Sequence, residues 1–337
     1  MLDTQSLNLG MSKPVRVAPA YPLLGAHVEK FERLIERDIV ERFPVWQQRE
    51  PKIQSYFASL FGGMPSLVIR AEFLSTKGDK EDLVGIGLDA AGIGIAHMLN
   101  VPIASLLATE LRGRGISCLG LHTSKATASE LVDLRAFMEV LQSNKISVTE
   151  VLDLDKTPSD CAAWIHAPYA ELPDSPRIKS SLERAVFGPV EYAQDRTCLL
   201  NVNALPLTDF TSLESLEGCY PLGFVIRKKL GPEIKVLRCL PDEPTKERDL
   251  KVWHETRRQV IEMLSSPLKS EFIVIPFRKV HEITMRKQKR REHTTLFFLR
   301  LRDKYRLVGG YGVSVRSGPV ELNEHAIIRP VHAMCGK

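Results

Sequence analysis

The stretch GISCLGLHTSKATASELVDLRAFMEVLQSNKISVTEVLDL, residues 115–154, decides the fold of much of this chain. Residues 116–123 form an apolar run typical of a strand, and 128–144 have the pattern of an amphipathic helix. The segment from 145 then returns as a strand. A strand, a crossover helix and a second strand at this spacing predict parallel pairing with a right-handed connection.

The segments that precede this unit predict a helix and a hairpin. Apolar residues spaced three and four apart predict a helix from about residue 26 to 43. The β-rich run SLVIRAEFL (66–74) is expected to pair with LVGIGL (83–88) across the turn STKGDKED. The glycine-rich run that follows, AGIGIAHML, predicts the start of another helix.

The segments that follow it change in character. The run CAAWIHA (161–167) predicts a further short strand. After residue 220, two strands are predicted around a Gly-Pro turn, followed by a long helix at 245–266 and a buried strand, EFIVIPF, at 271–277. TTLFFLRLRD and YRLVGGYGVSVRS are expected to close the chain as antiparallel strands. The fold class is therefore α/β together with α+β: a parallel α/β unit beside an antiparallel lobe.

Composition bounds the function classes without naming one. The 337 residues carry a net charge of +5, because 46 basic residues nearly balance 41 acidic ones, and this excess does not by itself indicate a nucleic-acid binder. The six cysteines are scattered without zinc-binding spacing and are expected to be reduced thiols. No apolar run approaches the length of a membrane span and no secretory signal opens the chain, so a cytoplasmic location is expected.

Taken in order, these segments resemble the circularly permuted ATP-grasp proteins, which include glutathionylspermidine synthase-like and eukaryotic glutathione synthase-like ligases. The resemblance runs from about residue 66 to 320 and rests on SLVIRAEFL with LVGIGLDAAGIGIA, on the parallel unit, on GFVIRKKLG, and on EFIVIPF with RLVGGYGVSVRS. It implies ATP-dependent ligation of a small, amino acid-like carboxylate to an amine or a carrier thiol through an acyl phosphate. ATP and Mg²⁺ are the implied cofactors.

The resemblance also suggests a division of the chain. We expect a loose N-terminal arm at 1–20, N-terminal helices and substrate-side strands at 21–110, a parallel, lid-like α/β domain at 111–200, and a C-terminal ATP-grasp-like α+β lobe at 201–337.

Basic residues are the implied contacts for substrate and phosphate. Arg70, which alternates with apolar neighbours, is expected to hold the substrate carboxylate; an ion pair with Glu72 on the same face of the strand is an equal alternative. Arg300 and Arg316, on late strands, are expected to reach phosphates. Arg227 and Lys228 are the implied phosphate-binding residues, and a solvated position at the edge of the sheet is an equal alternative for Arg227.

The adenine and metal sites follow from the same resemblance. Val274, Ile275 and Phe277 are implied to pack against adenine. Relatives carry carboxylate or amide ligands for Mg²⁺ on the strand before the glycine turn, where this chain has Gly85 and Gly87. Asp89 is the candidate replacement, and the pair Glu321 and Asn323 is a second possibility beside a plain polar turn.

The densest charge run, RKVHEITMRKQKRREH at 278–293, leaves several partners open. It is interpreted as a solvated loop, or as a loop that meets a carrier protein, an acidic partner or nucleic acid. No aromatic residues interleave it, which argues against base stacking. Gly85 and Gly87 at the expected ligand positions leave a catalytically degenerate ATP-grasp protein acting as an interaction scaffold as an alternative to the ligase, and a nucleic-acid binder that uses this basic run is a further alternative.

The sequence lacks the central motifs of other catalytic classes. The chain has no G-x-S-x-G elbow, no GxxxxGK[ST] phosphate loop and no HExxH motif. Buried histidines such as His122 and His166 are expected to be satisfied core residues.

Overall fold

The chain forms two compact units. A computed structural model describes residues 6–37, 66–76, 80–87, 90–124, 126, 128–154, 161–166, 176–183, 186, 199–200, 205–206, 211, 223–228, 233–238, 247–276, 282–285, 288–316 and 325–333. Unit 1 contains Met1–Ala193, Thr197–Leu200 and His281–Lys337, and unit 2 contains Gln194–Arg196 and Asn201–Val280. Unit 1 is therefore assembled from segments at both ends of the chain.

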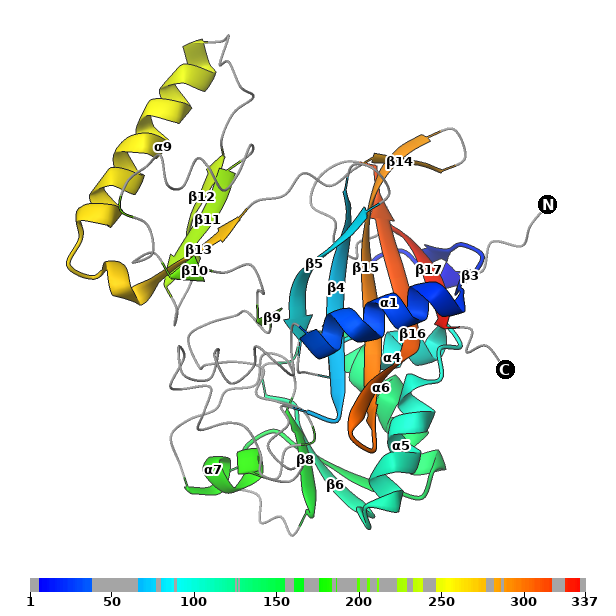
Figure 1. The fold of residues 1–337 in the computed structure, drawn as a ribbon. Coiled ribbons are helices and arrows are strands. Elements are labelled where there is room, and N and C mark those ends of the chain that lie inside the picture. Colours follow the sequence, from blue (N-terminus) through cyan, green and yellow to red (C-terminus); the bar gives the residue numbers. More distant parts are fainter. Residues whose placement is uncertain are drawn as a thin grey trace. The chain divides into compact units, whose positions relative to one another are not determined.

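A ten-stranded sheet is the centre of unit 1 within the described residues (Figure 1). Its main path runs β1-β2-β17-β16-β15-β4-β5-β9, with β14 paired to β15 and β3 paired to β17. In chain order these strands are β1 (Ser6–Leu7), β2 (Val15–Val17), β3 (Tyr21–Leu23), β4 (Val68–Thr76), β5 (Lys80–Gly87), β9 (Leu199–Leu200), β14 (Glu282–Met285), β15 (Gln288–Leu301), β16 (Lys304–Val315) and β17 (Ile327–Ala333). Pairing is antiparallel except where β17 meets β2 and β3.

The predicted hairpins are confirmed. β4 pairs antiparallel with β5, and β15 pairs antiparallel with β16. β15 also pairs with β4, so the last strands of the chain lie directly beside strands from its first third. Residues 281–337, which were expected to share a lobe with 201–280, belong instead to unit 1. The expected C-terminal lobe is thus divided between the two units.

The first residues of the chain take part in the sheet. Residues 1–20 were expected to be a loose arm, but β1 pairs with β2, and β2 pairs in parallel with β17. Val15 is fully buried and joins the main apolar core, while Arg16 beside it is exposed. The alternation Val15-Arg16-Val17 is a strand pattern that is too short to recognise without its partner strand.

The parallel unit is confirmed. β6 (Cys118–His122) pairs in parallel with β7 (Ser147–Val151) on one side and with β8 (Ala163–His166) on the other. The connection from β6 to β7 is helix α6 (Ala128–Ser143), as the pattern predicts. Helix α7 (Pro176–Glu183) follows β8.

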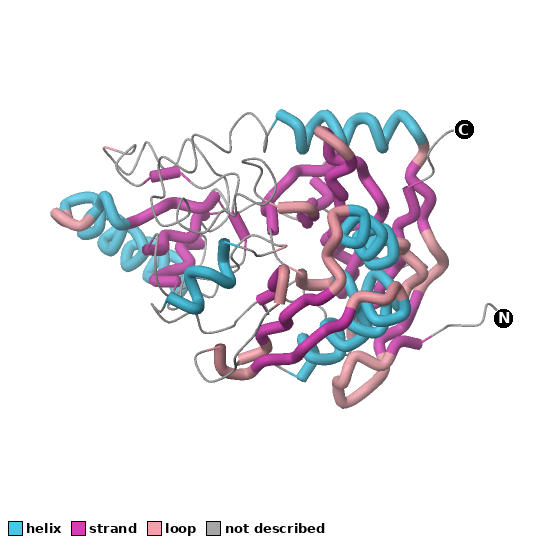
Figure 2. Tube along the Cα trace, turned by 90° about the horizontal axis from the view of Figure 1, so that it is seen from below, coloured by secondary structure: helices cyan, strands magenta, loops and turns pink. Residues whose placement is uncertain are grey.

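Helices cover both faces of the large sheet. Helix α1 (Gly25–Ile35) lies on one face, where Phe31 packs edge-on against Phe73 of β4 with ring centroids 4.8 Å apart. Helices α4 (Ile93–Met98) and α5 (Ile103–Gly113) share one apolar core with Phe297 and Leu299 of β15. In Figure 2, α1 and this helical group lie on opposite sides of the strand layer.

Unit 2 is a separate α+β unit. Its described strands are β10 (Leu205–Pro206), β11 (Gly223–Lys228), β12 (Glu233–Arg238) and β13 (Phe272–Pro276), in the order β10-β13-β11-β12, all antiparallel. Helix α9 (Glu247–Ser265) and the 3₁₀ turn η4 (Lys269–Glu271) lie between β12 and β13 in the chain. The three strands predicted after residue 220 and before residue 278, and the predicted long helix, are therefore confirmed. No described helix in either unit has the length and apolar character to span a membrane.

Candidate functional site

Arg70 forms the centre of a buried polar cluster on β4. Its side chain donates to the carboxylate of Glu72 on the same strand, and the two residues are 8% and 9% exposed. The alternative ion pair considered from the sequence is thus present. Alternate residues of a strand share a face, which explains why Arg70 and Glu72 meet.

His293 completes this cluster from β15. Its Nε2 lies 3.1 Å from the second carboxylate oxygen of Glu72. The register places Thr295 opposite Glu72, and His293 is two residues from Thr295 on the same strand, so His293 and Glu72 lie on the same face of the sheet. We call Arg70, Glu72 and His293 the Arg70 cluster. Sequence reasoning missed His293, because nothing local links it to β4.

Glu72 stays ionised although it is buried. Burial raises the pKa of its carboxyl, but the positive charge of Arg70, the charge of His293 and the hydrogen bonds from both side chains outweigh burial and lower the pKa from 4.5 to about 2. The cluster therefore holds a fixed negative charge beside the Arg70 guanidinium.

Two glycines of the neighbouring strand β5 lie opposite Arg70 and Glu72. Gly87 is the register partner of Arg70, and Gly85 is the register partner of Glu72. Opposite residues on neighbouring strands ordinarily bring their Cβ atoms to about 5 Å. Because glycine has no Cβ, β5 places no side chain against Arg70 and Glu72 at these two positions. The glycines stand where the family resemblance leads one to expect metal ligands.

The glycine turn after β5 is held by a carboxylate from another helix. Oδ2 of Asp133, on α6, accepts a hydrogen bond from the Gly92 backbone N–H, and Oδ1 accepts one from the Ile95 N–H, both at 2.7 Å. Gly92 has φ of +82°, and a Cβ there would lie 2.2 Å from the Tyr311 hydroxyl. These two amides at the start of α4 are therefore satisfied by the protein itself.

The two arginines that were expected to reach phosphates from late strands, Arg300 and Arg316, lie at opposite ends of the β15–β16 hairpin. Arg300 pairs with Tyr305 next to the hairpin turn, whereas Arg316 follows Val315, which pairs with Arg291 at the far end. Val315 is ten positions after Tyr305 on β16, which corresponds to a rise of roughly 33 Å along the strand. Arg300 is half-buried and Arg316 is exposed. The structure does not bring Arg300 and Arg316 together.

The nucleotide-binding residues expected from the sequence belong to unit 2. Arg227 and Lys228 end β11, and Val274 and Ile275 are on β13, which pairs with β11. Ile226 is the register partner of Val274. The strands expected to carry phosphate contacts and adenine contacts are therefore direct neighbours. Phe277 lies outside the described residues.

The metal site has no counterpart in the described part of the chain. Asp89, Glu321 and Asn323 all lie outside the described residues. Among the residues that are described, no three His, Cys, Asp or Glu side chains are placed to hold a metal ion. Glu72 is held by Arg70 and His293.

The basic run at 278–293 is not simply a solvated loop. Its described residues form β14 and the first part of β15, which pair as a hairpin. Arg290 is only 3% exposed. Alternation along β15 turns part of this basic segment inward, which a count of charges in the sequence does not reveal.

Two histidines expected in the core are paired with each other. His122 and His166 end the neighbouring strands β6 and β8, and their Nδ1 atoms are 3.2 Å apart. Burial lowers the pKa of His122 to about 4 and that of His166 to about 3. Nε2 of His166 lies 3.4 Å from the Ser181 hydroxyl of α7. Both rings are thus neutral near pH 7 and link two strands to a helix.

Comparison with known proteins assigns no family. No family model matches the chain, and no curated protein matches it. Among solved structures, a glutathione synthetase-like effector from Globodera pallida has a TM-score of 0.44 at 11% identity, covering 94% of this chain and 88% of its own. A putative gamma-glutamylcysteine synthetase from Methylobacillus flagellatus KT has a TM-score of 0.41 at 12% identity, covering 89% of this chain and 86% of its own. Both TM-scores are below 0.5, and neither likeness assigns a function to this chain.

Proposed function

We propose that this protein is a divergent ATP-grasp-type ligase that joins a small, amino acid-like carboxylate to an amine or a carrier thiol. The carboxylate oxygen would attack the γ-phosphorus of ATP, giving an acyl phosphate and ADP. The amine or thiol would then attack the acyl carbon, lose its proton and release phosphate. The proposal assigns acid binding to the Arg70 cluster of unit 1 and nucleotide binding to β11 and β13 of unit 2.

The single observation that carries the proposal is the surroundings of Arg70. A buried guanidinium lies on an inner strand of the large sheet with two side-chain-free positions of β5 opposite it and its ion-pair partner. Bidentate binding of a carboxylate needs a fixed fork of this kind and room beside it. Glu72, which pairs with both Arg70 and His293, would fix the orientation of the fork against which the substrate acid binds.

The phosphate contacts of the proposal rest on the pairing of β11 with β13. Arg227 and Lys228 supply positive charge on one strand, and the apolar residues Val274 and Ile275 lie on the next. Mg²⁺ would neutralise phosphate charge in such a reaction. Among the described residues, no three His, Cys, Asp or Glu side chains are placed to hold that ion.

Calorimetric titration of the full chain with ATP and Mg²⁺ tests the nucleotide assignment. Saturable binding that weakens in Arg227→Ala is expected, and no binding at millimolar ATP would overturn the ligase proposal. ADP release measured against pools of amino acids tests the acid assignment. Arg70→Lys keeps the charge but loses the fork, so it should reduce ADP release about tenfold or more while ATP binding is unchanged.

A non-catalytic scaffold is the second candidate, and one observation favours it. Gly85 and Gly87 lie on β5, the strand where relatives would place metal ligands. A folded chain that binds no ATP but binds a protein partner would support the scaffold. ATP binding together with substrate-dependent ADP release would exclude it.

A further inference from the structure

Three arginines gather at one end of the large sheet, away from the Arg70 cluster. Arg290 is on β15, Arg316 follows β16 and Arg16 is on β2. The pair farthest from the hairpin turn is Arg291 with Val315. Arg290 precedes Arg291 on β15 and Arg316 follows Val315, so both come next at this end of the hairpin. We call Arg16, Arg290 and Arg316 the arginine patch.

The sheet register brings Arg16 to the same end. Arg16 is the partner of Ile327 on β17, and Ile327 is the partner of Ser314 on β16. Ser314 in turn is the partner of Glu292 on β15. These residues form one row across four strands, which places Arg16 in line with the residues that surround Arg290.

Arg290 is fixed in place by neutral acceptors. Its Nε donates to the Ser314 hydroxyl at 3.1 Å, and one of its terminal amino groups donates to the Ser314 carbonyl at 2.7 Å and to the His325 carbonyl at 3.4 Å. Neutral acceptors orient a guanidinium but leave its charge uncompensated. The patch therefore has a rigid, buried cation at its base.

The charge of the patch is not balanced by the carboxylate beside it. Glu292 already forms an ion pair with Arg329 of β17. Neither Arg16 nor Arg316 has a carboxylate partner in the described part of the chain, and both are exposed. Burial lowers the pKa of Arg290, and repulsion from Arg316 and Arg16 lowers it further against the attraction of Glu292. That repulsion agrees with the register, which places both Arg316 and Arg16 near Arg290.

The patch lies on the other face of the sheet from the Arg70 cluster. Along β15, odd-numbered His293 meets Glu72, whereas even-numbered Arg290 and Glu292 meet Ser314 and Arg329. Successive side chains of a strand point to opposite faces. An anion bound at the patch would therefore be separate from the acid site proposed above, and this inference does not rest on the proposed ligase activity.

We propose that the arginine patch is a binding site for a phosphoryl group, carried by a pyrophosphate or a phosphate monoester. A phosphoryl group offers several oxygens and about two negative charges, which matches converging guanidinium forks better than the two oxygens of a carboxylate. The buried Arg290 would supply positive charge at the base of the site, and the side chains of the exposed Arg16 and Arg316 would contact the ligand.

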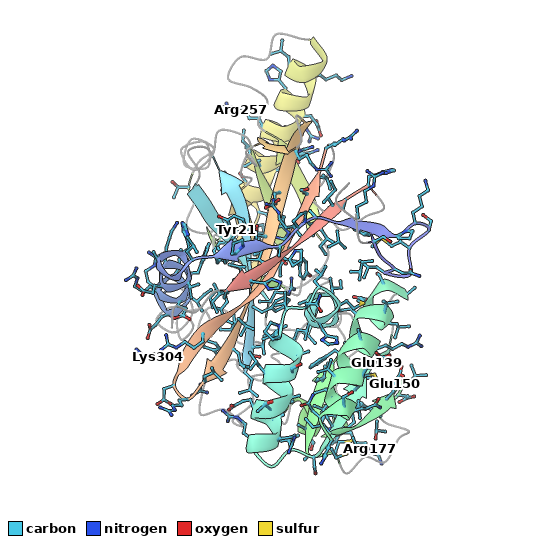
Figure 3. The ribbon with its side chains drawn as sticks, turned by 90° about the vertical axis from the view of Figure 1, so that its right-hand side faces the viewer. Tyr21, Glu139, Glu150, Arg177, Arg257 and Lys304 are labelled. Carbon is cyan, nitrogen blue, oxygen red and sulfur yellow. The ribbon has the colours of Figure 1, made fainter. Side chains whose placement is uncertain are left out.

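Calorimetric titration of the full chain with inorganic pyrophosphate tests this site. The test variant is Arg16→Gln/Arg316→Gln, which changes two exposed residues and leaves Arg290 in place. The matched control is Lys304→Gln/Arg306→Gln, which removes the same charge from the turn end of the same hairpin, where Figure 3 labels Lys304. Far-ultraviolet circular dichroism checks that both variants are folded.

The expected result is saturable binding of pyrophosphate that weakens about tenfold or more in the test variant and changes less than about twofold in the control. Vesicles of phosphatidylcholine with and without phosphatidic acid identify the source of the phosphoryl group. Patch-dependent binding to the acidic vesicles, with weak binding of free pyrophosphate, would support a lipid headgroup as that source. Equal binding by the two variants, or no binding of either probe, would overturn the proposal.

Discussion

At the scale of single residues, Glu72 supplies the buried negative charge of the Arg70 cluster. It is a buried carboxylate held by Arg70 and His293, and these contacts lower its pKa to about 2 despite burial. A buried ion pair of this kind contributes little net stability when intact, but loss of one partner leaves the other charge uncompensated. Removal of one partner is therefore expected to lower the free energy of unfolding by more than the intact cluster adds to it.

Glu72→Gln is expected to destabilise the protein by about 3 kcal/mol near neutral pH, because the Arg70 guanidinium loses its negative partner in a buried site. The folded-state pKa of Glu72 lies below its ordinary value of 4.5. Its ionised form thus stabilises the fold above that value, and this stabilisation is lost as the pH falls from 4.5 toward about 2. Glu72→Gln should flatten the pH dependence in this window. Urea unfolding at several pH values measures both effects.

Glu110→Gln is the control, since it breaks a more exposed ion pair with Arg114 on α5. It should lower the free energy of unfolding clearly less than Glu72→Gln does. An equal loss of stability in both variants would mean that burial of the Arg70 cluster has no special cost.

At the scale of elements, α4 depends on α6 for its N-terminus. Asp133 accepts two backbone hydrogen bonds at the glycine turn and is 5% exposed. α4 has six residues, too few to be stable without tertiary support. A Cβ at Gly94 would lie 1.8 Å from the Asp133 carbonyl oxygen, so the two helices are in close backbone contact.

Asp133→Ala is expected to lower the free energy of unfolding by about 2 kcal/mol, because it leaves the Gly92 and Ile95 amides without their acceptor. Glu139→Ala is the control on the same helix, at an exposed position labelled in Figure 3. It should change stability by less than about 0.5 kcal/mol. Chemical denaturation of the two variants compares them, and a loss no larger for Asp133→Ala than for Glu139→Ala would contradict this role.

At the scale of the whole molecule, unit 1 is built from two distant parts of the chain. β15 pairs with β4 on one side and β16 on the other, so the C-terminal strands are inside the sheet and not at its edge. Unit 2 consists almost entirely of the segment between them, Asn201–Val280. This arrangement predicts that the two units respond differently to deletion.

A chain that ends after residue 280 should fail to fold unit 1, because it loses β15, β16 and β17 and exposes the apolar face of β4. A chain in which residues 201–280 are replaced by a flexible linker should keep unit 1 folded, since its core residues lie outside that segment. Circular dichroism and gel filtration distinguish the outcomes. A folded truncation at residue 280, or collapse of the internal deletion, would show that the units are not independent.

Much of the architecture follows from local patterns. Apolar spacing predicts α6, continuous apolar runs predict β6 and β13, and the order of strand, helix and strand predicts parallel pairing. Short segments are the exception. β2 has three residues, and a strand of that length shows its pattern only beside a partner.

The candidate sites could be predicted only in part. Arg70 stands out in an apolar strand, and Glu72 lies within reach on the same face. His293 and Asp133 carry no local signal, since each acts on a strand or helix that is distant in sequence; Asp133 and Gly92 are 41 residues apart. Arg290 lies in a basic run whose charge predicts exposure to solvent, yet it is only 3% exposed.

The sequence by itself determined which segments become strands and helices, because apolar periodicity is a local property of the chain. Only the tertiary structure decided which charges from distant segments meet: His293 with Glu72 on one face of the sheet, and Arg290 with Arg16 and Arg316 on the other. The physical reason is strand register. A pairing shifted by one residue would turn each of these side chains to the opposite face, and that register is set by burial between strands far apart in the chain.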